Sequence, residues 1–313
     1  MNDEVGTVQI SIVVPIFGCG ESITELSTRL KNSIREITEN YEIILINDRS
    51  PDDSWSVIKN EIKNDSRVKG ILFSKNFGQH AAITAGLVHS TGKWIVVMDC
   101  DLQDQPEEII RLYNKAIEGY EQVVAVREDR QDSTFRKLAS RTFNSLINKL
   151  TGSKKNPGVS NFGIYSRKVI DSILQLEEQT RTFALLSEWV GFSRYELSVE
   201  HSARSSGHSS YSFGKLFFLA LETTIGFSNK ILRLIVACGL VISFFSLVVV
   251  VFIIVRKMAD TSLEIGWTSV IASIFLTSGI TISIIGVVGL YIGEIFKETK
   301  KRPLYIIESQ LNL

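Results

Sequence analysis

Residues 94–109 read WIVVMDCDLQDQPEEI, an apolar run that ends at Asp99 and leads into a short polar stretch. The run is short and rich in β-branched residues, which is typical of a buried strand. We expect a helix over about 106–118 after it. The segment therefore predicts a strand, a polar loop and a helix in succession, and the same succession is repeated along the chain.

Alternating strands and helices extend over the first 130 residues. Strands that are continuous apolar runs, joined by helices, indicate a mostly parallel sheet covered on both faces, and therefore an α/β fold. The predicted strands are 9–17, 41–48, 68–74, 93–99 and 121–128, and the predicted helices are 22–38, 53–63, 79–89 and 106–118. Beyond these, we expect a helix over 136–150, a turn over 154–163, a helix over 183–190 and a strand over 194–202.

Unusual polar residues follow the predicted strands. In parallel sheets of this kind, ligands bind outside the carboxyl ends of the strands. One edge of the sheet is therefore the expected binding site. The segments that meet there are 18–21, 47–53, 74–79, 99–103 and 127–130.

Charge is distributed unevenly, although Lys+Arg and Asp+Glu both number 34. Residues 234–255 and 265–293 carry no charge, and each run is longer than the roughly 20 residues that cross a hydrocarbon core. We predict transmembrane helices at about 231–255 and 266–292. A pair of buried soluble helices is the alternative, but such helices rarely lack a polar face. We expect residues 213–230 to form an interfacial amphipathic helix, with a packed soluble helix as the alternative.

Basic residues near the predicted spans indicate orientation. Lys230 and Arg233 precede the first span, and Lys297, Lys300 and Lys301 follow the second. By the positive-inside rule, both termini are cytoplasmic. The expected organisation is an α/β domain over 1–212, the membrane segments over 213–293, and a cytoplasmic tail over 294–313. The N-terminal residues are acidic and predict no signal peptide.

The three cysteines, Cys19, Cys100 and Cys238, are widely separated and lack the spacing of metal ligands. This usage fits a reducing compartment and argues against a disulfide framework or a zinc cluster. We expect ordinary buried thiols.

Asp99, Asp101 and Gln103 are candidate metal ligands. In an extended segment, residues two apart point the same way, so these three can present oxygens to one hard cation. Mg²⁺ and Mn²⁺ also take substrate phosphates, which a nucleoside diphosphate provides. The alternative is a helix N-cap and a solvated neighbour. Two carboxylates at the end of a buried strand, however, repel each other unless a cation compensates.

Several stretches resemble family 2 of the glycosyltransferases: SIVVPIF, YEIILINDRSPDDS, NFGQHAAITAGL, MDCDLQDQPEEI, VREDRQDSTFRKLAS and YIGEIFKETKKRPLY. Within that family the chain is similar to the polyprenyl-phosphate group, which includes dolichyl-phosphate mannose synthase and the bacterial undecaprenyl-phosphate aminoarabinose and glucosyl transferases. The resemblance implies a GT-A type fold, an inverting displacement, and Mg²⁺ or Mn²⁺. It further implies a UDP- or GDP-sugar donor, a polyprenyl phosphate acceptor in the cell (inner) membrane, and a homo-oligomer, a tetramer by resemblance. Nucleic acid is not an expected partner.

The resemblance also assigns residues. Asp48 matches the acid that contacts the nucleoside base, Asp99 the acid near the ribose and diphosphate, and Asp101 and Gln103 the metal ligands. Pro15 matches a loop that wraps the nucleotide, and Glu21 is a further candidate nucleotide contact. Arg204 matches a basic residue that approaches the diphosphate. Arg127, Arg130 and Arg136 match an acceptor-phosphate clamp, whereas their sequence alone equally allows a solvated, salt-bridged surface. The expected catalytic set is Asp99, Asp101, Arg127, Arg130 and Arg204.

The chain departs from the family pattern at Gly18, Cys19, Asn47, Gly163 and Ser210. Ser210 stands where the family has Lys, and Gly163 stands where it has Arg. These positions lie near expected nucleotide and sugar contacts. The departures therefore bear on which donor is used more than on the type of reaction.

The sequence predicts transfer of a sugar to a polyprenyl phosphate at the cytoplasmic face of a membrane. A phosphate monoester has a second pKa of about 6, so it needs no general base near neutral pH. One alternative is extension of a lipid-linked glycan or polysaccharide, for which Asp104 is the candidate base. Another is a non-catalytic membrane scaffold that retains the fold.

Overall fold

The computed structural model describes residues 8–127, 159–179, 181–199 and 266–313, with a few isolated positions between 237 and 255. The chain divides into two compact units. One unit contains the sheet and includes the C-terminal residues 302–313, and the other contains the long helix α10, Trp267–Thr299. Each unit is considered by itself.

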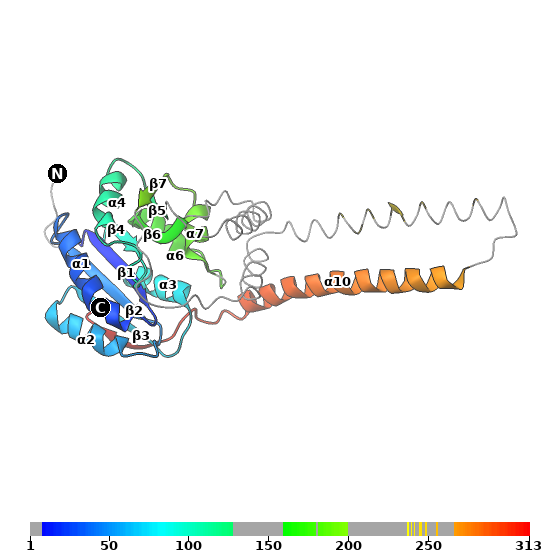
Figure 1. Cartoon of the computed structure of the whole chain (residues 1–313), viewed down its shortest axis with the longest axis horizontal. Helices are drawn as coiled ribbons and strands as arrows, with labels where there is room; N and C mark the ends of the chain where they lie inside the picture. The colour runs from blue at the N-terminus through cyan, green and yellow to red at the C-terminus, as the bar shows by residue number, and fades with distance from the viewer. Residues whose placement is uncertain are drawn as a thin grey trace. The chain divides into compact units, whose positions relative to one another are not determined.

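The sheet unit is built on eight described strands in the order β7-β5-β6-β4-β1-β2-β3-β8 (Figure 1). The strands are β1 Ile10–Ile16, β2 Tyr41–Asn47, β3 Val68–Phe73, β4 Trp94–Val97, β5 Gln122–Arg127, β6 Val159–Ser166, β7 Arg194–Val199 and β8 Ile307–Leu311. The helices are α1 Ile23–Arg35, α2 Ser54–Asn64, α3 Gln79–His89, α4 Glu108–Ala116, α6 Arg167–Leu174 and α7 Phe183–Trp189, with a 3-10 turn η1 at Gly20–Ser22.

Most of the strands run in one direction. β1 pairs in parallel with β2 and β4, β2 with β3, and β5 with β7. β6 pairs antiparallel with both β4 and β5, and β8 pairs antiparallel with β3. The expected mostly parallel α/β sheet is confirmed, and the two reversed strands make it mixed. The carboxyl ends of β1 to β5 consequently lie at the same edge.

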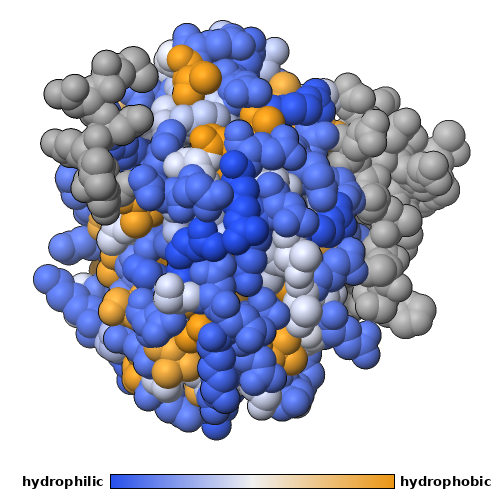
Figure 2. Space-filling view, turned by 90° about the vertical axis from the view of Figure 1, so that its left-hand side faces the viewer, coloured by the Kyte–Doolittle hydropathy of each residue, from blue (hydrophilic) through white to orange (hydrophobic). Residues whose placement is uncertain are grey.

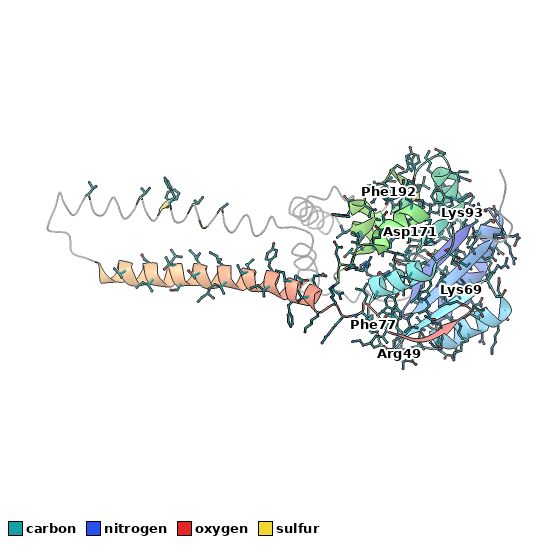
Figure 3. The ribbon with its side chains drawn as sticks, turned by 180° about the vertical axis from the view of Figure 1, so that it is seen from behind. Arg49, Lys69, Phe77, Lys93, Asp171 and Phe192 are labelled. Carbon is teal, nitrogen blue, oxygen red and sulfur yellow. A yellow bond between two sulfur atoms is a disulfide. The ribbon has the colours of Figure 1, made fainter. Side chains whose placement is uncertain are left out.

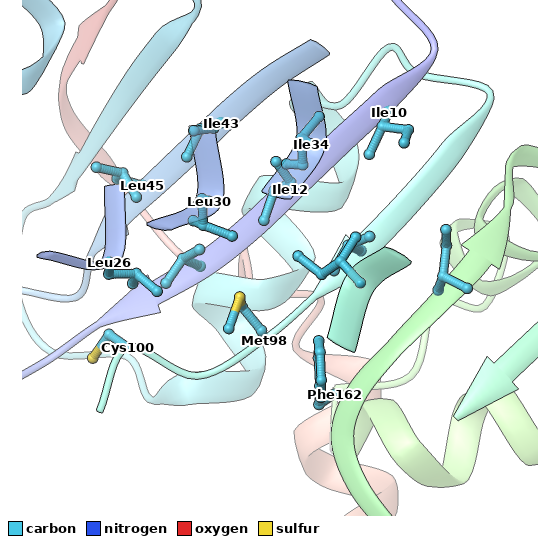
Figure 4. Packing of buried hydrophobic residues seen from close by; sticks show 14 of the residues in the cluster. Ile10, Ile12, Leu26, Leu30, Ile34, Ile43, Leu45, Met98, Cys100 and Phe162 are labelled. Atoms are coloured by element: carbon cyan, nitrogen blue, oxygen red, sulfur yellow. The ribbon is translucent and has the colours of Figure 1, made fainter. Parts of the chain in front are cut away.

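Helices cover both faces of the sheet. On one face, Ile12 and Val14 of β1 belong to the same buried cluster as Leu26 and Leu30 of α1 and Leu112 of α4 (Figure 4). These side chains are fully buried, and each contributes about 2 kcal/mol of hydrophobic stabilisation. Successive residues of a strand point to opposite faces, so Val13 faces the other layer. There it meets α3, which is grouped with α6 and α7.

Gly86 lets α3 approach the sheet closely. A Cβ atom at this position would lie 2.3 Å from Cγ1 of Val13 and 2.7 Å from Cδ1 of Ile46, which are side chains of β1 and β2. Contacts this short do not occur between carbon atoms in packed interiors. The absence of a side chain at Gly86 therefore fixes how near α3 lies to the two central strands.

The exterior of the sheet unit is mostly hydrophilic on the face drawn in Figure 2, where hydrophobic side chains are scattered. Scattered apolar side chains of this kind are normal on a folded domain. Helix α10 differs, because Ile274, Leu276 and Ile282 are among its many exposed apolar side chains. Its segment Leu276–Thr299 has a mean hydropathy of 1.9 over an 18-residue window. By length and composition, α10 can cross a membrane.

Helix α10 begins one residue after the start predicted for the second span and continues to Thr299 rather than 292. The first predicted span, 231–255, and the predicted interfacial helix, 213–230, lie almost wholly outside the described residues. Two membrane helices and the predicted domain boundaries therefore stay predictions. Among the described residues, α10 is the one helix that is long and apolar enough to span a bilayer.

Strands β6 and β8 were not predicted. Residues 159–163 of the predicted turn belong to β6, because pairing with β4 and β5 on its two sides outweighs the weak strand preference of a segment containing Asn and Gly. β8, with the sequence IESQL, alternates partly buried and exposed residues at the sheet edge beside β3. Short edge strands with charged side chains are a common way to end a sheet.

A disulfide joins Cys19 to Cys100, whose Cα atoms are 6.3 Å apart. Both residues are buried as expected, but the prediction of unpaired thiols is wrong. The two cysteines are 81 residues apart in sequence, and that separation hid their proximity. β1 and β4 are neighbours whose pairing extends to Val13 and Val97, so the residues just beyond both strands meet.

Asp52 joins two loops at the same edge. Its carboxylate accepts hydrogen bonds from the Gly20 N–H at 2.9 Å and the Ser50 hydroxyl at 2.5 Å, and also from the Ser54 hydroxyl. Ser50 in turn accepts the N–H of Gly18 at 2.8 Å. Burial raises the pKa of Asp52, but these hydrogen bonds outweigh it and lower the pKa to about 2. The loop after β1 is thereby held against the loop after β2.

Reduction of the Cys19–Cys100 bond is expected to destabilise the protein. A cross-link over a loop of this length contributes about 4 kcal/mol in the chain-entropy model. Purified protein in detergent should melt at a lower temperature after dithiothreitol treatment, as followed by tryptophan fluorescence. A Cys19→Ser/Cys100→Ser variant should have a low melting temperature that dithiothreitol does not change. Cys238→Ser should have the melting temperatures of wild type with and without dithiothreitol. Equal melting of oxidised and reduced wild type would contradict this.

Replacing Asp52 by Asn is expected to cost stability in a pH-dependent way. Because the folded-state pKa of Asp52 lies below its ordinary value of 3.8, the ionised group stabilises the fold above pH 3.8, and this contribution is lost as the pH falls towards 2. The shift corresponds to about 2 kcal/mol, and solvent screening at this exposed residue reduces it to about 1 kcal/mol.

Urea unfolding of wild type and Asp52→Asn at pH 7 and pH 2.5 measures this difference. It should be largest at pH 7 and shrink at pH 2.5. Asp53→Asn is the matched control, because the Asp53 side chain makes no cap hydrogen bond to α2. A stability difference of the same size at both pH values would show that the charge of Asp52 is not responsible.

Candidate functional site

The candidate site lies at the edge where the carboxyl ends of β1 to β5 meet. Figure 3 shows Arg49, which follows β2, and Phe77, which follows β3, towards the same end of the sheet unit. Lys69, near the start of β3, and Lys93, just before β4, lie towards the other end. The strand directions place the segments that follow β1 to β5 at this edge, and the binding site expected there stays a prediction.

Asp48 lies directly after β2 and is 2% exposed. Its two carboxylate oxygens accept hydrogen bonds from the backbone N–H of Phe77 at 2.6 Å and of Gly78 at 2.8 Å. Burial raises the pKa of Asp48, and these two hydrogen bonds offset part of that effect. A carboxylate has about four lone-pair directions, so these bonds leave acceptor capacity for a ligand. The base contact assigned to Asp48 by resemblance stays a prediction.

Asp99 and Asp101 follow β4 and are both partly exposed. Oδ1 of Asp99 accepts a hydrogen bond from Nε2 of Gln79 at 2.6 Å, and Oδ1 of Asp101 accepts the backbone N–H of Gln103 at 3.2 Å. Asp99 and Asp101 therefore bring two carboxylates to the loop that follows β4, and Gln103 lies in the same loop. Leu102, between Asp101 and Gln103, has a φ of 57°, which breaks the extended geometry expected from the sequence. The alternation of side chains along this segment is correspondingly interrupted.

The oxygen donors of this segment fit a hard divalent cation in part. Carboxylate and amide oxygens are ligands that Mg²⁺ and Mn²⁺ accept. Within the described residues, no three His, Cys, Asp or Glu side chains converge into a complete metal site. Mg²⁺ commonly binds through one or two carboxylates together with water and substrate phosphates. The donor set therefore fits a cation that is held jointly with a diphosphate.

Three candidate arginines cannot be placed. Arg130, Arg136 and Arg204 lie outside the described residues, as does Ser210. Arg127 is the last residue of β5 and pairs in register with Val199 of β7. Because β5 runs in the direction of β4, Arg127 reaches the same edge as the Asp99 segment. Its role in an acceptor-phosphate clamp stays a prediction.

Pro15 does not lie in a loop. It is buried within β1, in register with Ile46 of β2, because pairing between these strands continues to Ile16. A nucleotide contact by the Pro15 side chain is therefore not favoured, and the loop begins two residues later. Glu21 is exposed in the turn η1, inside that loop.

Gly163 occupies a crowded position in β6. A Cβ atom there would lie 2.8 Å from the carbonyl oxygen of Val123 and 3.0 Å from the hydroxyl of Tyr165. The backbone packing therefore leaves no room for the arginine that the family pattern has at this place. Asp104, considered as a base for glycan extension, is 2% exposed. A base must reach the hydroxyl that it deprotonates, so this burial weighs against that role.

Sequence reasoning missed two residues that organise the edge, Asp52 and Gln79. Asp52 lies in a polar loop where its partners, the N–H of Gly20 and two serines, could not be identified from spacing. Gln79 begins a predicted helix and was not distinguished from other helix residues. One usable signal was position, because both residues fall within segments expected at the carboxyl edge.

Comparison with known proteins gives consistent results. The model of the Glycosyl transferase family 2 matches residues 11–174. The Bacillus subtilis (strain 168) protein YkcC, named an uncharacterized glycosyltransferase, is 36% identical over 307 residues, covering 98% of this chain and 95% of that protein. The undecaprenyl-phosphate 4-deoxy-4-formamido-L-arabinose transferases of Enterobacter sp. (strain 638) and Salmonella choleraesuis (strain SC-B67) are 34% and 35% identical over 303 residues, covering 96% of this chain and 93% of theirs.

Among solved structures, glucosyl-3-phosphoglycerate synthase from Mycobacterium tuberculosis aligns with a TM-score of 0.47 at 16% identity, over 71% of this chain and 78% of that chain. The family assignment does not depend on it. The family model covers more than half of the 313 residues, and relatives above 30% identity align along nearly the whole chain. The chain belongs to glycosyl transferase family 2.

Proposed function

We propose that this glycosyltransferase moves a sugar from a nucleotide-sugar to a polyprenyl phosphate, at the cytoplasmic face of the cell membrane, for synthesis or modification of envelope glycans. The observation that carries the proposal is that one chain combines the Asp99–Asp101 edge with an apolar helix of membrane-spanning length. Relatives named undecaprenyl-phosphate transferases align over 96% of the chain, a span that includes both features.

The proposed donor half of the site lies between the ends of β1, β2 and β4. Asp48 would meet the nucleoside base and Asp99 the ribose and diphosphate, while Asp101 and Gln103, together with Asp99, would hold Mg²⁺ or Mn²⁺. When bound, such a cation supplies positive charge that stabilises the departing diphosphate. The loop after β1, with Glu21, is tied to the site through the hydrogen bonds of Asp52, which keep that side of the site in place.

The proposed acceptor needs little chemical activation. Its phosphate is largely a dianion near neutral pH, so its oxygen can attack the anomeric carbon in line with the leaving diphosphate. The work left to the protein is positioning and charge neutralisation. Arg127 would bind the acceptor phosphate, with Arg130 and Arg136 as further proposed partners. The burial of Asp104 agrees with a reaction that needs no carboxylate base.

If α10 spans the membrane, as we propose, a soluble donor and a lipid acceptor can meet at the sheet unit. A polyprenyl chain is too apolar to leave the bilayer readily, so its phosphate must be met at headgroup depth. Lys297, Lys300, Lys301 and Arg302 lie at and just after the end of α10. By the positive-inside rule, this cluster favours a cytoplasmic end. The proposed orientation therefore places the sheet unit in the compartment that contains nucleotide-sugars.

The proposal predicts a metal-dependent glycolipid product. Purified protein in detergent is incubated with undecaprenyl phosphate, Mg²⁺ or Mn²⁺, and radiolabelled UDP- and GDP-sugars, and label is extracted into organic solvent. Asp101→Ala should lower kcat/KM by at least about 100-fold, or about 2.7 kcal/mol in transition-state stabilisation, because it removes a proposed metal ligand. Asp171→Ala, at an exposed acid of α6, is the matched control and should retain activity.

A second set of assays tests the acceptor by replacing undecaprenyl phosphate with undecaprenol or with a lipid-linked sugar. Undecaprenol, which lacks the phosphate, should give no product. Transfer to the lipid-linked sugar alone would contradict the proposal in favour of glycan extension. Nucleotide binding that needs no metal, with no transfer from any donor, would instead favour a non-catalytic scaffold.

A further inference from the structure

We propose that Gln79 is a positioning residue that holds the Asp99 carboxylate for cation binding. The start of α3, which carries Gln79, also holds Asp48, so one helix start positions both acids. The part that Gln79 plays in sugar transfer rests on the proposed function. The hydrogen bonds that hold Asp48 and Asp99 at the start of α3 do not depend on that function.

The start of α3 contacts both acids. Phe77 and Gly78 donate their backbone N–H groups to the two oxygens of Asp48, and the next residue, Gln79, donates its side-chain amide to Oδ1 of Asp99 at 2.6 Å. Asp48 follows β2 and Asp99 follows β4, with β1 between these two strands in the sheet. Three consecutive residues therefore connect two acids that come from separated strands.

The position of this connection is well determined. Gly78 has a φ of 96°, which other residues adopt only with strain, and it directly precedes α3. The body of the helix is held by the close approach of Gly86 to Val13 and Ile46. Backbone conformation before the helix and packing along it thus place the Gln79 side chain. A shift of α3 would move the partners of both Asp48 and Asp99 together.

An amide is suited to this task. It donates a hydrogen bond that orients the carboxylate of Asp99 without bringing a positive charge beside it. The negative charge of Asp99 is therefore not neutralised by Gln79 and can attract a cation. Gln79 is exposed, so the contact lies at the open side of the edge, where a ligand can reach Asp99. A methionine of similar length would keep the shape of Gln79 and remove the donor.

The test measures cation binding directly. Mn²⁺ is titrated into full-length protein in detergent with UDP or GDP present, and free Mn²⁺ is followed by electron paramagnetic resonance. Gln79→Met should raise the Mn²⁺ dissociation constant about 5-fold, as expected for loss of a hydrogen bond to a charged group that is partly in contact with solvent. Nucleotide affinity measured in EDTA should change less than about 2-fold, and the melting temperature should stay that of wild type. Gln79→Ala serves as a second variant and should give the same selective loss.

His89→Met is the matched control, because His89 is the last residue of α3, at the end remote from the site. It should leave Mn²⁺ binding unchanged. Mn²⁺ affinity of Gln79→Met and Gln79→Ala within about 2-fold of wild type would overturn the proposal. If the variants lose metal-free nucleotide affinity and melt at a lower temperature as well, Gln79 has a merely structural role and the proposal is overturned. The proposal is also overturned if wild-type protein binds no Mn²⁺ with either nucleotide. Wild-type binding without sugar transfer would overturn the acceptor assignment alone, and leave the role of Gln79 supported.

Discussion

The common direction of β1 to β5 is the constraint on which the rest of the site depends. Parallel pairing brings the carboxyl ends of these strands to one edge, and each loop that leaves that edge carries polar residues. The central strands are mostly apolar, and the polar residues of the candidate site lie in the loops that follow them. The position of Asp48 and Asp99 follows from this geometry, in the GT-A-like layout of a family 2 glycosyltransferase.

Local sequence predicted the central part of this fold well because the relevant signal is local. Apolar runs such as IVVPI and IILIN leave few alternatives to buried strands, and helices α1 to α4 follow each run within a short loop. β6 and β8 were missed because their stability comes from neighbours. β6 contains Asn and Gly and is held on both sides, and β8 is a polar strand whose partner, β3, lies far away in sequence.

The candidate site was predicted in its residue types but not in its connections. Asp99 and Asp101 were recognised because they end an apolar strand, whereas the Cys19–Cys100 bond, the hydrogen bonds of Asp52 and the contact of Gln79 all cross between loops. Such contacts depend on the order of strands in the sheet, and β1 lies between β4 and β2 although it comes first in the chain. Spacing along the sequence contains no information on that order.

Strand order also explains why the residues after α10 matter to the site. Residues 302–313 belong to the sheet unit, where Tyr305 stacks on Phe73 with ring centroids 5.1 Å apart and Ser74 donates its N–H to the Ile306 carbonyl at 3.0 Å. Arg49, next to Asp48, has a φ of 53° and forms an ion pair with Glu308 of β8. A left-handed arginine costs about 1 kcal/mol, and a surface ion pair offsets up to about as much. The segment that follows α10 therefore packs against the same loop that presents Asp48, so residues 302–313 contribute to the site edge.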